Sequence, residues 1–397
     1  MIFAPLIPSD LSNKISEKHL YLAKQICEVS LKLSSSHNKF ILDEVISLLR
    51  TTNSYYSNMI ESQGTHPIDI YNASKGNFTN DKKNKSLQEL SLIHIEVQNF
   101  ISNTYQDNKK AYELEYILEL HKQFYTKDEM KEYLSISYNN ISATMIPGIL
   151  RDKEVKIGNL IAPTYMHIQP YMYEFESAYN NAIKYKSKEE QLICILASHH
   201  RFVYLHPFLD GNGRISRLFL DYLFFKIGID GYGLWNISRG LARNINKYKE
   251  MLSMADIIVQ GNTDGRGPLS NRGLEYFLDF MLETSFDQVT YMYENLKMDK
   301  LSTKIENFVK LSYSGLIDGI KLPKYTDLLF KNLLLKGELK RSEVAKIIGK
   351  SDRTASRLIA TLLKEDFLQS KSNKSPISIK INPKFASYII SDLMPIV

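Results

Sequence analysis

The chain has 397 residues, 44% hydrophobic and 24% charged, a composition typical of a globular protein with room for two or three domains. No apolar run reaches the roughly 18 residues of a membrane span, and the N-terminus lacks the basic and apolar regions of a signal peptide. The only cysteines, Cys27 and Cys194, provide neither a disulfide framework nor a metal-binding set. A cytoplasmic protein without membrane contact is therefore expected.

The net charge of +6 is concentrated near the C-terminus. Residues 331–386 contain 13 Lys and Arg against 5 Asp and Glu, so this segment carries +8 and the remainder −2. A basic surface is the electrostatic signature of nucleic-acid binding. DNA is therefore considered as a partner of this segment alone.

Most of the chain has apolar residues at the three- and four-residue spacing of helices, and no internal repeat is evident. The spacing predicts helices over 11–33, 40–60, 86–104, 112–125, 171–184, 189–204 and 215–227. The polar stretch 76–85 is predicted to be an exposed loop. Strands and helices do not alternate, so an all-α fold is expected.

Two stretches depart from the helical pattern. Val155 and Ile157 alternate with polar residues between turn residues, which predicts a short β-hairpin. Residues 262–273 are rich in Gly, Asn and Asp and are predicted to form a loop. Helices are expected to follow this loop, from Leu274 to about Tyr313.

The pattern changes again from about Leu335. It predicts a short helix over 342–348, a second helix over 352–364 capped by Ser351, and a hairpin formed by 368–371 and 377–381. Helix, turn, helix and hairpin is the order of a winged helix-turn-helix. The basic residues of its second helix and wing that would contact DNA phosphates are Arg353, Arg357, Lys364, Lys371 and Lys374. Packing against the core or binding of protein is the alternative.

The segment 206–217 combines residue types that suit phosphate chemistry. Gly211 and Gly213 precede a helical pattern, so backbone N–H groups can form an anion nest at a helix N-terminus. Arg214 and Arg217 share one face of that helix, and two guanidinium groups suit a polyphosphate.

Two further side chains of this segment complete the predicted chemistry. Asp210 directly precedes the nest, where Mg²⁺ between carboxylate and phosphate would relieve their repulsion. His206 has the pKa range of a general base for an attacking hydroxyl, a role worth about 10²–10⁴-fold in rate.

His-Pro-Phe-Leu-Asp-Gly-Asn-Gly-Arg-Ile-Ser-Arg at 206–217 resembles the Fic family motif, H-x-F-x-[D/E]-G-N-G-R-x-x-R, at every specified position. The resemblance implies a helical core in which His206 activates a Ser, Thr or Tyr hydroxyl of a target protein. It also implies that Asp210 holds Mg²⁺, that AMP is transferred from ATP, and that pyrophosphate leaves. The residues of the motif assigned to nucleotide binding are Asp210, Gly211, Asn212, Gly213, Arg214, Ile215, Ser216 and Arg217.

The predicted hairpin resembles the flap of this family, which pairs with an extended stretch of the target. A purely structural hairpin is the alternative. The hairpin residues included in the candidate site are Val155, Lys156, Ile157 and Gly158. Tyr248 is included as a wall of the adenine pocket, with core packing as its alternative.

Ser57 and Glu61 are four residues apart and share a helix face. They resemble the [S/T]-x-x-x-E-[G/N] segment of N-terminally inhibited Fic proteins, although Ser62 stands where Gly or Asn is usual. The resemblance implies that Glu61 pairs with Arg217 and takes the place of the γ-phosphate. Orientation of water for removal of AMP is the alternative role.

The resulting layout has an N-terminal helical region with the inhibitory helix (1–110), a catalytic core (111–292), a helical linker (293–334) and a winged helix (335–397). The leading hypothesis is an autoinhibited protein adenylyltransferase that uses ATP and Mg²⁺ and, by resemblance, forms a homodimer. The alternatives are another nucleotide donor, removal of AMP, and a DNA-binding regulator whose Fic core is a sensor.

Overall fold

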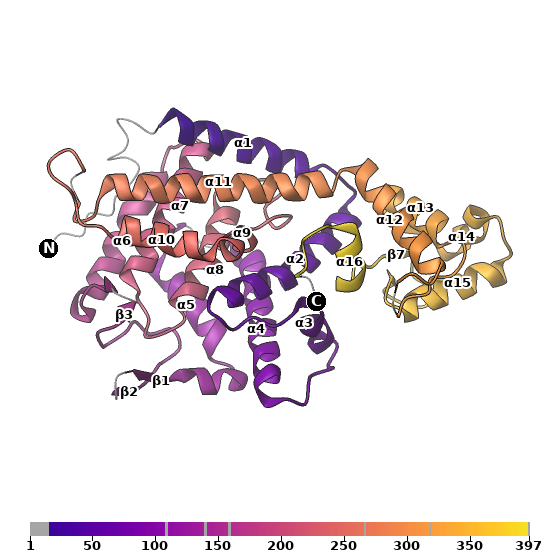
Figure 1. Ribbon diagram of the computed structural model, residues 1–397, viewed down its shortest axis with the longest axis horizontal. Coiled ribbons are helices and arrows are strands. Elements are labelled where there is room, and N and C mark those ends of the chain that lie inside the picture. The colour runs from indigo at the N-terminus through magenta and orange to yellow at the C-terminus, as the bar shows by residue number, and fades with distance from the viewer. Residues whose placement is uncertain are drawn as a thin grey trace.

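The computed structural model describes residues 16–107, 110–138, 141–157, 160–265, 267–317 and 319–395. Helices dominate these ranges, which confirms the predicted all-α class (Figure 1). None of the helices in this part of the chain combines the length and the apolar run that crossing a bilayer requires.

The N-terminal part of the fold contains α1 (Glu17–Ser34), α2 (Lys39–Ile60), α3 (Pro67–Ser74) and α4 (Lys82–Thr104). The start of the predicted helix 11–33 lies outside the described residues, and α1 begins after its cap, Ser16. The prediction of a loop over 76–85 is wrong at its end, because the Asp81 side chain caps α4. The sequence analysis missed α3, which has only eight residues.

The central part contains α5 (Leu114–Tyr125), α6 (Ile168–Ile183), α7 (Lys188–Leu205), α8 (Asn212–Lys226), α9 (Ser238–Arg243), α10 (Ile245–Ala255) and α11 (Asn271–Asn295). Both α7 and α8 are buried along most of their length, so they form the centre of the core. The long helix α11 runs beside α1 (Figure 1). The predicted loop 262–273 ends earlier than expected, because Ser270 caps α11.

Short strands and 3-10 helices connect α5 to α6: η1 (Asp128–Leu134), β1 (Ser135–Tyr138), β2 (Ile141–Thr144), β3 (Lys156–Ile157), β4 (Leu160–Ile161) and η2 (Tyr165–His167). The strands form two antiparallel hairpins. Pairing of Lys156 with Ile161 and of Ile157 with Leu160 confirms the predicted hairpin, while Gly158 lies outside the described residues. The hairpin β1–β2 was not predicted.

The C-terminal part contains α12 (Met298–Tyr313), α13 (Thr326–Lys336), β5 (Glu338–Leu339), α14 (Arg341–Ile348), α15 (Asp352–Lys364), β6 (Leu368–Gln369), β7 (Ile377–Ile379) and α16 (Pro383–Ile389). Both predicted helices and the hairpin are present, with shorter strands than expected. A third strand, β5, gives the sheet order β5-β7-β6. Helix α13, which the sequence analysis assigned to a linker, packs against α14.

This C-terminal part docks onto α2 through a buried carboxylate. Glu44 of α2 accepts hydrogen bonds from the Gln369 side chain at 2.6 Å and from the backbone N–H of Ile381 at 3.0 Å. Further along α2, the Tyr56 hydroxyl donates to the carbonyl of Leu393 at 3.0 Å. One helix therefore carries both the docking surface for the C-terminal part and, at its end, Glu61.

Replacing Glu44 with alanine is expected to lower the free energy of unfolding by about 2–3 kcal/mol, because the buried N–H of Ile381 loses its acceptor. Urea unfolding of the whole chain measures this change. Glu28→Ala on the exposed face of α1 is the matched control, with an expected loss below about 0.5 kcal/mol. Equal stability of the two variants would contradict the docking role of Glu44.

Candidate active site

The candidate catalytic loop joins the two central helices. His206 ends α7 with φ 49° and ψ 60°, in the left-handed region. Gly211 has φ 79° and directly precedes α8. A left-handed conformation is uncommon for a residue other than glycine, so the surrounding structure must hold His206 in it.

Core contacts fix the middle of this loop. Phe208 is buried and stacks on His121 with ring centroids 3.9 Å apart. The Asn212 side chain accepts from the N–H of Phe208 at 2.9 Å and donates to its carbonyl at 2.8 Å. The Asn212 side chain therefore braces the loop, and binding of nucleotide by this residue stays a prediction.

Arg217 is held by two residues of α2. Its Nε donates to the Ser57 hydroxyl at 2.9 Å, and an Nη donates to the Ser57 carbonyl at 2.8 Å. The same Nη lies 2.8 Å from Oε1 of Glu61. Only 2% of the Arg217 side chain is exposed, against 34% for Glu61. The contact expected from the sequence is therefore present, with Glu61 at the open side of the pair.

Arg214 is also occupied by neighbouring side chains. It donates to Oδ1 of Asn58 at 2.9 Å, to the Tyr125 hydroxyl at 3.1 Å, and to Oε1 of Gln63. The sequence analysis missed these three partners. Asn58 lies within the segment that carries Glu61, but nothing in the local pattern links Gln63 or Tyr125 to the loop.

The two glycines of the nest are sites of close approach. A Cβ atom on Gly213 would lie 2.1 Å from Oε1 of Glu61, and one on Gly211 would lie 2.4 Å from the Tyr125 hydroxyl. The carboxylate of Glu61 therefore occupies the space directly against the N-terminal turn of α8. The N-terminus of a helix can bind a carboxylate in the place of a phosphate oxygen.

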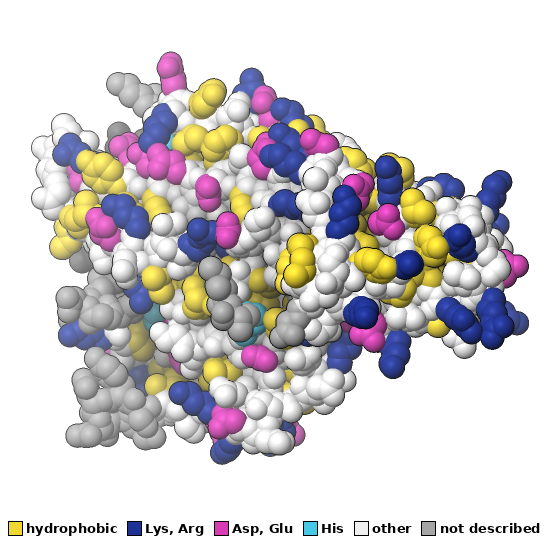
Figure 2. Space-filling model, turned by 45° about the vertical axis from the view of Figure 1, so that its right-hand side comes forward, with side chains coloured by type: hydrophobic (Ala, Val, Ile, Leu, Met, Phe, Trp, Pro, Cys, Tyr) yellow, Lys and Arg dark blue, Asp and Glu magenta, His cyan; other side chains and the backbone are white. Residues whose placement is uncertain are grey.

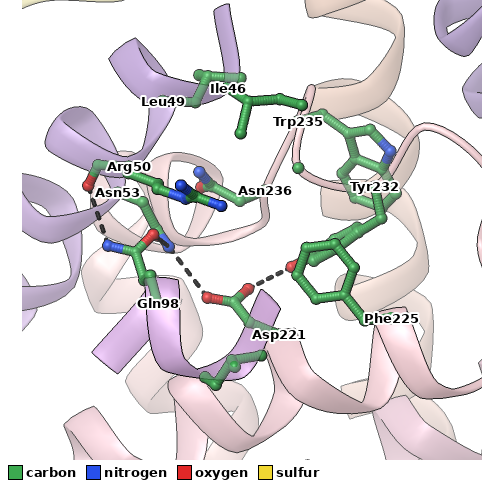
Figure 3. Close-up of a pocket in the computed structure, with 12 residues that line it drawn as sticks. Ile46, Leu49, Arg50, Asn53, Gln98, Asp221, Phe225, Tyr232, Trp235 and Asn236 are labelled. Atoms are coloured by element: carbon green, nitrogen blue, oxygen red, sulfur yellow. Dashed lines mark hydrogen bonds between the residues drawn. The ribbon is translucent and has the colours of Figure 1, made fainter. Parts of the chain in front are cut away.

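Buried polar contacts between α2 and α8 continue one turn away from Arg217. Asn53 of α2 donates to Oδ2 of Asp221 on α8 at 3.0 Å, and the Tyr232 hydroxyl donates to its other oxygen (Figure 3). Burial raises the pKa of Asp221 to about 6, an effect that these hydrogen bonds partly offset. The two helices are thus fixed in the register that brings Glu61 to Arg217.

The pKa values of the two main candidates move in ways that fit their positions. Burial acts to raise the pKa of Glu61, but the charges of Arg217 and Arg214 outweigh it and the pKa is lowered. Glu61 is therefore an ionised carboxylate at neutral pH. The pKa of His206 is lowered to about 4, chiefly by burial and also by the charge of Arg151. Its imidazole is neutral at pH 7, the form that a general base requires.

Asp210 is the exposed acidic residue of the loop. Its Oδ1 accepts from the N–H of Gly211 at 2.7 Å, which orients the carboxylate at the mouth of the nest. The described residues contain no cluster of three or more His, Cys, Asp or Glu suited to a metal. A single carboxylate still fits Mg²⁺, which binds through one or two carboxylates together with substrate phosphates.

Three further residues predicted to bind nucleotide are buried, and each forms a hydrogen bond within the protein. Ile215 and Ser216 are buried; the Ile215 N–H donates to Gly211 at 3.0 Å and the Ser216 hydroxyl donates to Gly213 at 2.8 Å. Tyr248 is buried and bonded to His199 at 2.7 Å.

The hairpin residues that were predicted to belong to the site show few contacts that relate to it. Lys156 of β3 is exposed, and the carbonyl of Val155 accepts from Ala162 at 3.3 Å. The bond between Ala162 and Val155 extends the hairpin by one residue pair. Neither Val155 nor Lys156 has a hydrogen bond to the catalytic loop among the described residues.

The fold places the neutral imidazole of His206 at the end of α7, and Arg214 and Arg217 on α8, the helix whose N-terminus follows the loop. Residues 111–224 match the Fic/DOC family. The part of the chain that contains the candidate catalytic loop is therefore similar to the Fic/DOC family.

Two curated relatives carry the name "Protein adenylyltransferase Fic". The protein from Drosophila willistoni is 32% identical over 81 residues, which are 20% of this chain and 16% of that protein. The one from Drosophila yakuba is 28% identical over 109 residues, covering 28% of this chain and 20% of that protein. The chain thus spans at most 20% of the length of these two relatives.

Solved structures extend the likeness of fold over more of the chain. A Fic family protein from Desulfovibrio desulfuricans G20 matches with a TM-score of 0.52 and 14% identity over 92% of this chain and 97% of that chain. Fic-1 from C. elegans matches with a TM-score of 0.54 and 13% identity over 73% and 76% of the two chains. The likeness of fold therefore reaches well beyond residues 111–224.

Proposed function

We propose that this protein is an adenylyltransferase that transfers AMP from ATP to a hydroxyl side chain of a target protein. The observation that carries the proposal is the glycine-flanked N-terminus of α8, which follows the neutral imidazole of His206 and precedes Arg214 and Arg217 on the same helix. Such a nest binds phosphate, and the histidine supplies a base for the attacking hydroxyl. The name of the curated relatives supports the same activity.

The proposed reaction is a single displacement at the α-phosphorus of ATP. The hydroxyl oxygen attacks the α-phosphorus, and its proton passes to the imidazole of His206. The bond from the α-phosphorus to the bridging oxygen of the β-phosphate breaks, and pyrophosphate leaves. Asp210 would hold Mg²⁺, which neutralises charge on the phosphates when bound. Arg214 and Arg217 would stabilise the leaving pyrophosphate once their present partners give way.

The protein is proposed to be autoinhibited in the conformation described here. Glu61 fills the space against Gly213 and uses the Arg217 donors that a phosphate needs. Ionised Glu61 would also repel the terminal phosphates of ATP. Removal of AMP is the competing role for Glu61, in which the same carboxylate would orient a water.

Mass spectrometry of the Glu61→Gly protein after incubation with ATP, Mg²⁺ and a cell lysate tests the activity. The expected product is an adenylyl group on a Ser, Thr or Tyr hydroxyl, either on this chain or on a target. Unlabelled UTP and GTP serve as competitors, because the nest reads phosphates rather than the base. A uridylyl, guanylyl or phosphocholine adduct would replace AMP transfer with another donor, and absence of any adduct would refute the proposal.

DNA binding by the C-terminal part is the second candidate function. Arg353 and Arg357 of α15 are exposed, as are Lys364, Lys371 and Lys374. No salt bridge involves these five within the described ranges. Figure 2 shows Lys and Arg side chains gathered on the lobe that this part of the chain forms. Unpaired cations on a helix and an adjacent wing suit the phosphates of a duplex.

The double substitution Arg353→Ala/Arg357→Ala is expected to weaken binding of the whole chain to duplex DNA and to reduce its salt dependence by about two in log–log slope. Fluorescence anisotropy across a salt series measures both quantities. Lys24→Ala/Lys32→Ala on the exposed face of α1 removes the same charge and should leave the slope unchanged. Absence of binding at low salt would refute a DNA partner.

A further inference from the structure

Arg151 is the buried link between the catalytic loop and the segment that forms β3–β4. Its side chain is 0% exposed. Its Nε donates to the carbonyl of His206 at 2.8 Å, and its backbone N–H donates to the carbonyl of Pro207 at 2.9 Å. Side chain and backbone together hold two consecutive peptide groups at the start of the loop.

The two Nη atoms of the guanidinium form hydrogen bonds at the two ends of the hairpin. One Nη donates to the carbonyl of Lys153 at 2.9 Å, and the second donates to the carbonyl of Pro163. Lys153 precedes β3 and Pro163 follows β4. A single planar side chain therefore ties both ends of the hairpin to the residue that carries the candidate base.

Burial of the Arg151 guanidinium is unfavourable for the stability of the fold. The carboxylate nearest to Arg151 is half-exposed Glu154, with Oε2 3.9 Å away, so carbonyl dipoles supply the hydrogen bonds to this buried cation. Burial lowers the pKa of Arg151 to about 10. Buried charges without a close counter-ion are costly, and the bonded carbonyl belongs to His206, whose φ of 49° requires support.

We propose that Arg151 is a positioning residue, which holds His206 in its left-handed conformation and couples it to β3–β4. The base and the edge offered to a target segment then move as one unit. This inference rests on the proposed function, because the coupling serves to align His206 with a target hydroxyl that is docked at the hairpin and receives AMP. The guanidinium fork suits the role since its donors lie in one plane and reach three separate carbonyls.

The test uses the Glu61→Gly protein as parent, with Arg151→Ala and Arg151→Lys added separately. We expect Arg151→Ala to lower the self-labelling rate at saturating ATP about 100-fold, the scale of a misplacement of about 1 Å. Affinity for ATP, measured by equilibrium binding, is expected to stay within about threefold, because Arg151 contacts no residue of the nest. Lys153→Ala is the matched control, since Arg151 uses only the carbonyl of Lys153.

A spectroscopic measurement separates geometry from charge and does not need activity. The charges that act on the pKa of His206 are those of Arg151 and Glu61, and the parent lacks the second. Histidine-selective NMR titration should therefore show a raised His206 pKa in Arg151→Ala and a nearly unchanged one in Arg151→Lys. A labelling rate that still falls about tenfold in Arg151→Lys would identify lost positioning rather than lost charge.

Two results would overturn the inference. The first is a labelling rate of Arg151→Lys within about threefold of the parent rate. The second is a fall in ATP affinity parallel to the fall in rate, which would indicate general damage to the site. If Arg151→Ala does not fold, Arg151→Lys carries both readouts. Failure of the parent to label would refute the adenylyltransferase proposal, and the NMR signals of His206 would still report whether Arg151 fixes the ring.

Discussion

Glu61→Gly should increase the rate of self-labelling from ATP about tenfold. The contact with Arg217 is a charge-assisted hydrogen bond, a class that contributes about 1.5–3 kcal/mol, and each 1.4 kcal/mol corresponds to about a factor of ten. Solvent access to Glu61, which is 34% exposed, favours the lower end of this range. Glycine is tolerated here because Glu61 is the residue that ends α2. Transfer of label from ATP labelled at the α-phosphate measures the rate.

The size and charge of Glu61 can be separated. Glu61→Gln keeps the length of the side chain and removes its charge, so an intermediate rate is expected. The gain in affinity should be larger for ATP than for ADP if Glu61 competes with the terminal phosphate. Equal rates for the native protein and Glu61→Gly would contradict the inhibitory role. Loss of label from the native protein, but not from Glu61→Gly, after ATP is removed would instead assign Glu61 to removal of AMP.

The local part of the site was predictable from the sequence because it depends on neighbours in the chain. The position of Gly211 before α8 and the shared face of Arg214 and Arg217 follow from turn chemistry and helical spacing. The contact of Glu61 with Arg217 was reached by resemblance to a family. Spacing alone supplied only the common face of Ser57 and Glu61.

The contacts that hold the site in place depend on tertiary packing and were not predictable. Tyr125 reaches Arg214 from α5, and Arg151 reaches His206 across 55 residues. Asn212 lies in the predicted nucleotide-binding motif, and the fold of the loop turns its side-chain amide onto the backbone of Phe208. Local patterns do not record which side chain satisfies a buried backbone group several elements away.

The short C-terminal elements were missed for a related reason. Strand β5 has two residues and α16 seven, too few for a periodicity to emerge. The attachment of this part to Glu44 links it to the helix that carries Glu61. A ligand of the C-terminal part can therefore influence the active site only if its affinity depends on whether α2 holds Glu61 against Arg217.

His206→Ala in the Glu61→Gly protein is expected to lower the labelling rate about 10²–10⁴-fold, the usual contribution of a general base. ATP affinity should be nearly unchanged, because the phosphate donors lie on α8. His19→Ala is the matched control, since His19 bonds Asp279 at 2.8 Å on the α1–α11 face and has no contact with the loop.

The pH dependence gives this prediction a second, independent readout. A base works when it is unprotonated, so activity is retained above its pKa and is lost as the pH falls through that value. Burial and the charge of Arg151 lower the pKa of His206 to about 4, and removal of Glu61 eliminates an influence that raises it. The labelling rate of Glu61→Gly should therefore persist well below pH 6.5, the ordinary value for histidine, provided the protein stays folded. A loss of rate centred near pH 6.5 would mean that His206 is solvated during catalysis, in a loop conformation different from the one described here.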